Sequence, residues 1–187
     1  MEGTLTDRAA LPERRTLFAS LRRTLRGPRL LLMAVGLVVV LVSLPLLRTL
    51  ALKENELDAM RVLDLLGREV LAAEAAPLSL GYALQEDKSL SRRLPDSHLL
   101  ADGRLVLRHG YLFELVQSVE GGQALRAWPA AHGETGLAAF WSSAPGRLLG
   151  HPNRAATWSG IASPPEPIER DGQWRLLSLS PTRNEGL

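Results

Sequence analysis

The sequence predicts an α+β protein in which a single N-terminal transmembrane helix continues into an amphipathic helix packed on a small antiparallel β-sheet. Three observations predict this fold. No charged residue occurs between Arg29 and Arg48. An apolar stripe with helical spacing follows. From Gly103 onward the apolar residues alternate with a period of two, in short runs that are separated by Gly and Pro.

Composition limits the classes of protein and site that need to be considered. The chain has 187 residues, which is enough for one modest domain with appendages. It contains no cysteine, which excludes disulfides, thiolate metal ligands and a cysteine nucleophile. The formal net charge is only +2, so the whole-chain charge gives no reason to expect a nucleic-acid partner.

These patterns divide the chain into six segments. They are a cytoplasmic basic tail (1–29), a transmembrane helix (30–50), an amphipathic domain helix (51–77), a connecting loop region (78–103), an antiparallel β-meander (104–180) and a C-terminal tail (181–187).

The apolar segment from Leu30 to Leu47 predicts a membrane span. A bilayer core of about 30 Å is crossed by about 20 apolar helical residues, and a helix that is apolar on all sides is typical of a membrane. A cleaved signal peptide is the alternative, but its apolar region would be shorter and a small-residue cleavage site should follow. We therefore expect a retained anchor, in which Gly36 could admit a neighbouring helix and Pro45 should bend or loosen the last turn.

The charges that flank the span predict its orientation. Arginines crowd the N-terminal side, whereas the basic residues that follow the span are interleaved with acidic ones. The positive-inside rule then places the N-terminus in the cytoplasm and residues 48–187 outside it. The lipid bilayer is accordingly the first expected partner.

The next segment predicts an amphipathic helix that Pro77 closes. We expect a sheet to cover its apolar stripe, with a coiled-coil seam as the alternative. Asp58 and Arg61 lie off the stripe and are close enough to pair. The stripe consists of Leu52, Ala59, Leu63, Leu66, Val70 and Ala73, of which Leu63, Leu66 and Val70 are the predicted helix-interface residues.

The distal half predicts a meander of short strands. Tyr111–Val119 and Gln123–Ala130 form a hairpin across a turn whose two glycines permit positive φ. Leu137–Ser143 and Arg147–His151 form a second hairpin, and Gln173–Ser180 is a last edge strand. The face toward the helix is expected to carry Phe113, Leu115, Leu125, Phe140 and Leu148.

The stretch "HGYLFEL…AWPAAHGETGLAAFW…G", followed by "WSG", carries a more specific pattern. Together with the helix-then-sheet order, it resembles type IV pilin-like proteins, including pseudopilins, over roughly residues 50–165. The matching positions are Gly110, Tyr111, Phe113, Ala127, Trp128, Pro129, Gly133, Thr135, Gly136, Phe140 and Gly146.

The resemblance implies a non-enzymatic structural or assembly component of a pilus, a type II secretion system or another envelope system. It implies the bacterial inner membrane as the location and other membrane or pilin-like proteins as partners. The N-terminus departs from the pilin pattern, because a prepilin peptidase site resembles a glycine followed by Phe or Met, with Glu at the fifth position. Here Pro28 follows Gly27 and Leu32 occupies that fifth position, which indicates an uncleaved anchor or a divergent minor component.

No catalytic, cofactor-binding or metal-binding residue is predicted. His132 and Glu134 share a loop, where a solvated loop is expected in preference to a weak metal site. Asp96, Ser97 and His98 are adjacent and so point in different directions, which favours a turn over a catalytic triad. The alternative function is an extracytoplasmic ligand- or partner-binding module on a signal anchor. A concave apolar pocket lined by Tyr111, Trp128 and Trp141 would favour it, although tryptophans in a small domain are usually core residues.

Overall fold

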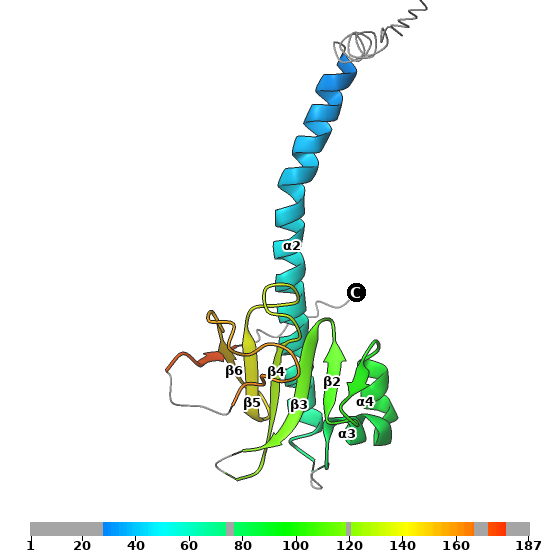
Figure 1. Ribbon diagram of the computed structural model, residues 1–187. Helices are drawn as coiled ribbons and strands as arrows, with labels where there is room; N and C mark the ends of the chain where they lie inside the picture. The colour runs from blue at the N-terminus through cyan, green and yellow to red at the C-terminus, as the bar shows by residue number, and fades with distance from the viewer. Residues whose placement is uncertain (1–27, 74–76, 119–120, 167–171, 179–187) are drawn as a thin grey trace, which may run out of the picture. The chain divides into compact units, whose positions relative to one another are not determined.

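A computed structural model describes residues 28–73, 77–118, 121–166 and 172–178. It comprises two compact units, Met1–Leu47 and Arg48–Leu187, which are described in turn (Figure 1). Most of the predicted basic tail and all of the predicted C-terminal tail lie outside the described residues.

The described part of the first unit is the N-terminal portion of helix α2, which spans Pro28–Glu69. Proline suits the first helical position because its missing N–H has no partner to lose there. The side chains from Leu30 to Leu47 are exposed apart from the half-buried Ser43, and the helix is long and apolar enough to cross a membrane. The hydroxyl of Ser43 donates to the Val39 carbonyl oxygen at 2.6 Å, so this polar group is satisfied within its own helix. The predicted long apolar N-terminal helix is therefore confirmed.

The second unit is built on a seven-stranded antiparallel sheet, whose strands follow one another in chain order among the described residues. This order is that of a meander, in which each strand pairs with its neighbour in the sequence. The strands are β1 (His98–Leu100), β2 (Leu105–Arg108), β3 (Tyr111–Gln117), β4 (Gln123–Pro129), β5 (Ala139–Ala144), β6 (Arg147–His151) and β7 (Arg175–Leu177).

The turn between β3 and β4 has the predicted backbone chemistry. Gly121 and Gly122 have φ values of 82° and 91°, which L side chains rarely adopt. The N–H of Ser118 donates to the Gly122 carbonyl oxygen at 2.9 Å and closes the turn. The predicted glycine turn is thus confirmed in the part of it that the structure describes.

One face of the sheet packs on the domain part of α2. Buried side chains of the helix meet buried side chains of the strands, so the expectation that a sheet covers the stripe is confirmed. The end of the stripe differs from the prediction, because α2 ends at Glu69 and Ala73, beyond the helix, is exposed. The buried residues at this interface include Ala59, Val62, Leu63, Leu66 and Val70 from the helix and Tyr111, Phe113, Leu125, Phe140 and Leu148 from the sheet, with Leu115 partly buried beside them.

A glycine in the helix sets how closely α2 approaches the sheet. Gly67 is buried, and a Cβ added there would lie 3.2 Å from the hydroxyl oxygen of Ser142 on β5. Such a distance is tighter than ordinary van der Waals contact. Gly67 is therefore less favourable for the helix than Ala by about 1 kcal/mol, but it allows α2 to pack closely against β5.

Residues 78–103, expected as a connecting loop region, contain two short helices before β1. Helix α3 (Leu80–Glu86) begins after Ser79, whose side chain accepts from the Tyr82 N–H, and α4 (Lys88–Arg93) begins after Asp87, which caps it in the same way. Each helix has only two turns, too few to show a helical period in the sequence. The apolar side chains that hold them, Leu80, Ala83, Leu84, Leu90 and Leu94, join the core on the helix side of the sheet.

The opposite face of the sheet is covered by the chain that follows β6. Trp128 on β4 donates its indole N–H to the Gly160 carbonyl oxygen at 2.7 Å. Arg126 pairs with Glu114 on the neighbouring strand and donates to the Pro165 carbonyl oxygen at 2.6 Å. A second apolar cluster, formed by Leu105, Leu112, Trp128 and Ala139, lies beneath this cover.

Candidate functional site

Most of the motif residues lie toward one end of the sheet, where β3 begins and β4 ends, whereas Gly146 lies in the turn between β5 and β6. Tyr111 and Pro129 are register partners at this end of the sheet, and the Ala130 N–H donates to the Gly110 carbonyl oxygen at 2.9 Å. The Tyr111 hydroxyl donates to the Ala138 carbonyl oxygen at 3.0 Å. The sheet end and the loop between β4 and β5 are thereby fixed to each other.

Close packing explains why the motif contains glycines at two of these positions. Gly110 has a φ of 75°, and a Cβ there would lie 2.5 Å from the Cβ of Thr135. At Gly136 an added Cβ would lie 2.2 Å from the Tyr111 hydroxyl oxygen. The spacing of the motif therefore reflects two residue pairs, Gly110 with Thr135 and Tyr111 with Gly136, that interlock across the loop.

Polar side chains of α2 bind this same loop. Arg48 Nη2 donates to the Gly133 carbonyl oxygen at 2.8 Å, and Asn55 Nδ2 donates to the Thr135 carbonyl oxygen at 2.9 Å. One carboxylate oxygen of Glu56 accepts from the N–H groups of the next two loop residues, Leu137 at 2.9 Å and Ala138 at 3.2 Å. We call this set of contacts between α2 and residues 131–138 the helix–loop joint.

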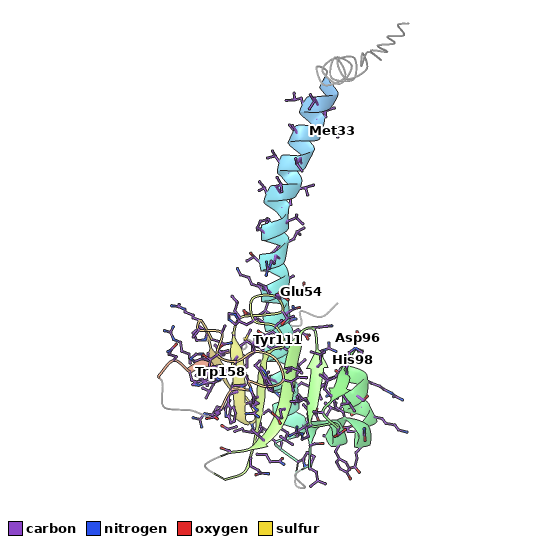
Figure 2. The ribbon with its side chains drawn as sticks, in the orientation of Figure 1. Met33, Glu54, Asp96, His98, Tyr111 and Trp158 are labelled. Carbon is purple, nitrogen blue, oxygen red and sulfur yellow. The ribbon has the colours of Figure 1, made fainter. Side chains whose placement is uncertain are left out.

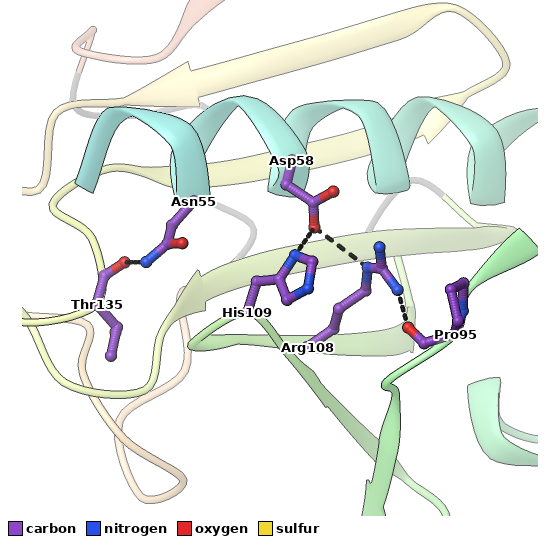
Figure 3. Close-up of polar contacts among 6 residues, drawn as sticks. All are labelled: Asn55, Asp58, Pro95, Arg108, His109 and Thr135. Carbon is purple, nitrogen blue, oxygen red and sulfur yellow. Dashed lines mark hydrogen bonds and ion pairs between the residues drawn. The ribbon is translucent and has the colours of Figure 1, made fainter. Parts of the chain in front are cut away.

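An ion-pair cluster extends the attachment to the turn between β2 and β3 (Figure 3). One carboxylate oxygen of Asp58 lies 2.9 Å from His109 Nδ1 and 3.2 Å from Arg108 Nε. Arg108 also donates to the Pro95 carbonyl oxygen and thus connects α2 with the chain between α4 and β1. Because the Arg108 side chain is only 10% exposed, its guanidinium needs these partners to offset the cost of burying a charge. The partner that the sequence suggested for Asp58, Arg61, is instead exposed.

Tyr111 is the buried titratable group at the joint. Burial raises the pKa of its hydroxyl above the ordinary value, and the nearby Glu56 carboxylate adds to that effect. Tyr111 thus stays protonated and keeps donating to Ala138 over the physiological range. Its role here is to hold the loop, and its raised pKa makes it a poor general base.

Several predicted site residues have core positions. Leu63, Leu66 and Val70 are at most 4% exposed and pack within their own domain. Tyr111, Trp128 and Trp141, which would favour a binding module if they lined one pocket, are not brought together in the described part of the chain. Tyr111 belongs to the helix-side cluster and Trp128 to the cluster on the opposite face, while Trp141 is also buried.

The sequence predicts no metal-binding or catalytic cluster, and the structure bears on this in the residues that it describes. Among these residues, no three His, Asp or Glu side chains converge as a metal site. Asp96 and His98 lie beside α4, away from the joint at Tyr111 (Figure 2). Asp96 has a φ of 63° and precedes β1, so the expected turn is followed at once by a strand that the sequence did not indicate.

A groove beside that strand is lined by α3, α4 and the start of β1. Its volume is about 550 Å³. Apolar and charged side chains both line it, and Leu84, Leu94 and Leu99 alternate with Lys88, Arg92 and Asp96. Of the adjacent residues Asp96, Ser97 and His98, the first two line this groove.

The sequence contains a pattern that indicates the joint, but the stripe was predicted from its apolar residues alone. Arg48 and Asn55 continue the stripe of Leu52 and Ala59 at steps of four, three and four residues. A polar residue in phase with an apolar stripe faces the partner surface and must find hydrogen bonds there. In this domain the partner surface is the motif loop.

The joint consists of donors and acceptors that pair with one another within the domain. It ties the beginning of the domain part of α2 to two turns of the sheet. Comparisons of the chain with protein families, with curated proteins and with solved structures found no match.

Proposed function

We propose that this chain is a single-pass membrane protein with a pilin-like extracytoplasmic domain. In this proposal it acts without catalysis, as a structural or assembly component of a pilus, secretion or other envelope system in the bacterial inner membrane. One observation carries the proposal: the same helix, α2, contains the exposed apolar segment and the buried stripe that organises the domain. A chain built in this way couples an anchor to a folded head without a separate linker.

The helix–loop joint supports a mechanical role. A domain that bears load from partners, or that must present a fixed surface to them, needs rotation about its anchor helix to be restricted. Three polar contacts from Arg48, Asn55 and Glu56 restrict it at the loop, and Asp58 restricts it at the next turn of the sheet. These side chains are spread over eleven helical residues, about 15 Å along the helix axis, and so resist rotation better than a single contact would.

The anchor part of the proposal can be tested by membrane extraction and protease access. We expect the protein to stay with membranes in alkaline carbonate, and external protease to digest the domain in spheroplasts while sparing the N-terminal tail. Val40→Arg places a charge near the middle of the span, at a cost of about 2.5–3.5 kcal/mol, and should reduce insertion. Leu57→Arg is the matched control, because Leu57 is an exposed position of the same helix within the domain. Carbonate extraction of the wild-type chain would refute the anchor.

The assembly part needs a separate test. Affinity capture of the tagged full chain from cross-linked membranes, followed by identification of the captured proteins, should recover pilus or secretion components. The control is the Val40→Arg chain, which should lose them. A wild-type chain that cross-links to no other protein and behaves as a monomer would contradict an assembly role while leaving the anchor intact.

The groove beside β1 supports a second function, an extracytoplasmic binding module. Its volume of about 550 Å³ lies within the range of small-molecule sites, roughly 300–1,000 Å³. A thermal-shift screen of small extracytoplasmic metabolites would test it. A ligand should stabilise the wild-type chain and fail to stabilise Leu99→Arg. Leu176→Arg on β7, which is also exposed but does not line the groove, should respond as the wild type does. Equal responses of both variants would exclude this groove as the binding site.

A further inference from the structure

The tip of the motif loop lies beside the first residue that follows the apolar segment. Arg48 is that residue in the sequence, and its guanidinium donates to the Gly133 carbonyl oxygen at 2.8 Å. The other loop contacts lie further along the helix, Thr135 at Asn55 and Leu137 at Glu56. At 1.5 Å per residue, Arg48 precedes Asn55 by about 10 Å along α2, so the loop extends toward the start of the domain and Gly133 is its tip.

The length of the apolar segment sets the depth of this tip. Leu30–Leu47 has a helical length of about 27 Å, slightly less than the hydrocarbon thickness of about 30 Å. The mismatch draws the next residues toward the hydrocarbon boundary, where Leu50, which is 54% exposed, is an apolar side chain that fits. Arg48 must then extend its guanidinium outward to polar groups, as long basic side chains do at a membrane surface.

The domain itself supplies a polar group at that position. The carbonyl oxygen of Gly133 accepts from Arg48, so the guanidinium reaches a backbone acceptor of its own chain. The headgroup layer adds about 5–7 Å on each side of the hydrocarbon core, which is comparable to the reach of an arginine side chain. A loop tip within that reach of the boundary has to lie among the lipid headgroups.

We propose that residues 132–134, at the tip of the loop, form a second and shallow membrane contact, seated in the headgroup layer of the bilayer that α2 crosses. Arg48 couples the two contacts, because it lies at the boundary and holds the tip. The contact fixes the tilt of the domain against the membrane surface, which a single helix crossing does not. This inference rests on the membrane anchor of the proposed function.

The absence of cysteine allows a direct depth measurement, since each introduced cysteine carries a unique label. Three full-length variants, each labelled with an environment-sensitive fluorophore, are reconstituted in phosphatidylcholine vesicles. Glu134→Cys reports the tip, where the wild-type residue is exposed. Gln117→Cys is the matched control at an exposed position, about 20 Å away at the other end of β3. Val40→Cys reports the span.

The expected result is that lipids with a headgroup nitroxide quench the label at position 134 and leave the label at 117 unchanged. Lipids with a nitroxide deep in the acyl chain should quench the label at 40. Labels at 134 and 117 that behave alike, with position 40 still quenched, would overturn the loop contact and leave the anchor intact. A label at 40 that escapes quenching would overturn the anchor itself.

Two further measurements separate the lipid surface from other occupants. Quenching at position 134 should persist when the protein is diluted tenfold in lipid; its loss would assign the tip to a second copy of the chain and overturn the proposal. Adding Arg48→Gln to the Glu134→Cys chain should reduce headgroup quenching, because the guanidinium no longer holds Gly133. Unchanged quenching in that chain would overturn the coupling role of Arg48.

Discussion

Replacing Arg108 by Met tests whether the ion-pair cluster holds the domain to α2. The change keeps much of the aliphatic volume and removes the charge, so Asp58 retains only His109 and the Pro95 carbonyl oxygen loses its donor. The protein should still fold, because the apolar core beneath is untouched. Its free energy of unfolding should fall.

The magnitude follows from the burial of the two partners. Breaking a fully buried ion pair costs about 3–5 kcal/mol, whereas an exposed pair contributes about 0–1 kcal/mol. The Arg108 side chain is 10% exposed and that of Asp58 is 24% exposed, which places this pair between the two limits, at about 2 kcal/mol. Loss of the donor to Pro95 adds about 1 kcal/mol. We expect Arg108→Met to cost about 2–3 kcal/mol in total.

The assay is urea unfolding of the full chain in detergent, followed by tryptophan fluorescence. All four tryptophans belong to the unit Arg48–Leu187, so the signal reports the domain. A double-mutant cycle of Arg108→Met with Asp58→Asn should give a coupling of about 1–2 kcal/mol. Arg61→Met is the control, because the exposed Arg61 is the partner that sequence spacing alone suggests for Asp58. The reasoning is refuted if Arg61 couples to Asp58 and Arg108 does not.

Three other substitutions test the packing and the titration of the joint. Gly136→Ala should cost about 1–3 kcal/mol, because its Cβ would meet the Tyr111 hydroxyl at 2.2 Å; an unfolding midpoint equal to that of the wild type would contradict the interlock. Tyr111 has a raised pKa in the folded state, so above about pH 10 the unfolded chain releases a proton that the folded chain keeps, and stability should fall by about 1.4 kcal/mol per pH unit. In urea titrations at pH 9 and 11, Tyr111→Phe should lose this slope. Tyr82→Phe should retain most of it, because Tyr82 is exposed and its pKa is raised mainly by its hydrogen bond to Glu86. Leu63→Ala should cost about 2–5 kcal/mol and Leu57→Ala, on the exposed face of α2, close to nothing; equal losses would mean that the stripe is assigned to the wrong face.

The sequence alone determined the features that depend on local periodicity and composition. Three features of the sequence are each typical of one type of element. They are the uncharged segment of α2, the stripe with Leu63 and Leu66, and the two-residue alternation through Tyr111 and Phe113. These features predicted the helix-then-sheet order and the face of the sheet that meets the helix, and both agree with the structure. The glycine turn after β3 was predictable because its backbone conformation excludes most other residues.

The tertiary structure decided the features that depend on partners distant in the sequence. Helices α3 and α4 form because Leu84, Leu90 and Leu94 are buried in the core. Each helix has only about two turns, which is too short to show helical periodicity in the sequence. Asp58 pairs with Arg108, fifty residues away, and not with a neighbour on its own helix. The phase of Arg48 and Asn55 on the apolar stripe indicates that both face a partner surface, but the sequence does not identify the acceptors on that surface. Only the three-dimensional structure shows that they are the backbone carbonyl groups of the motif loop.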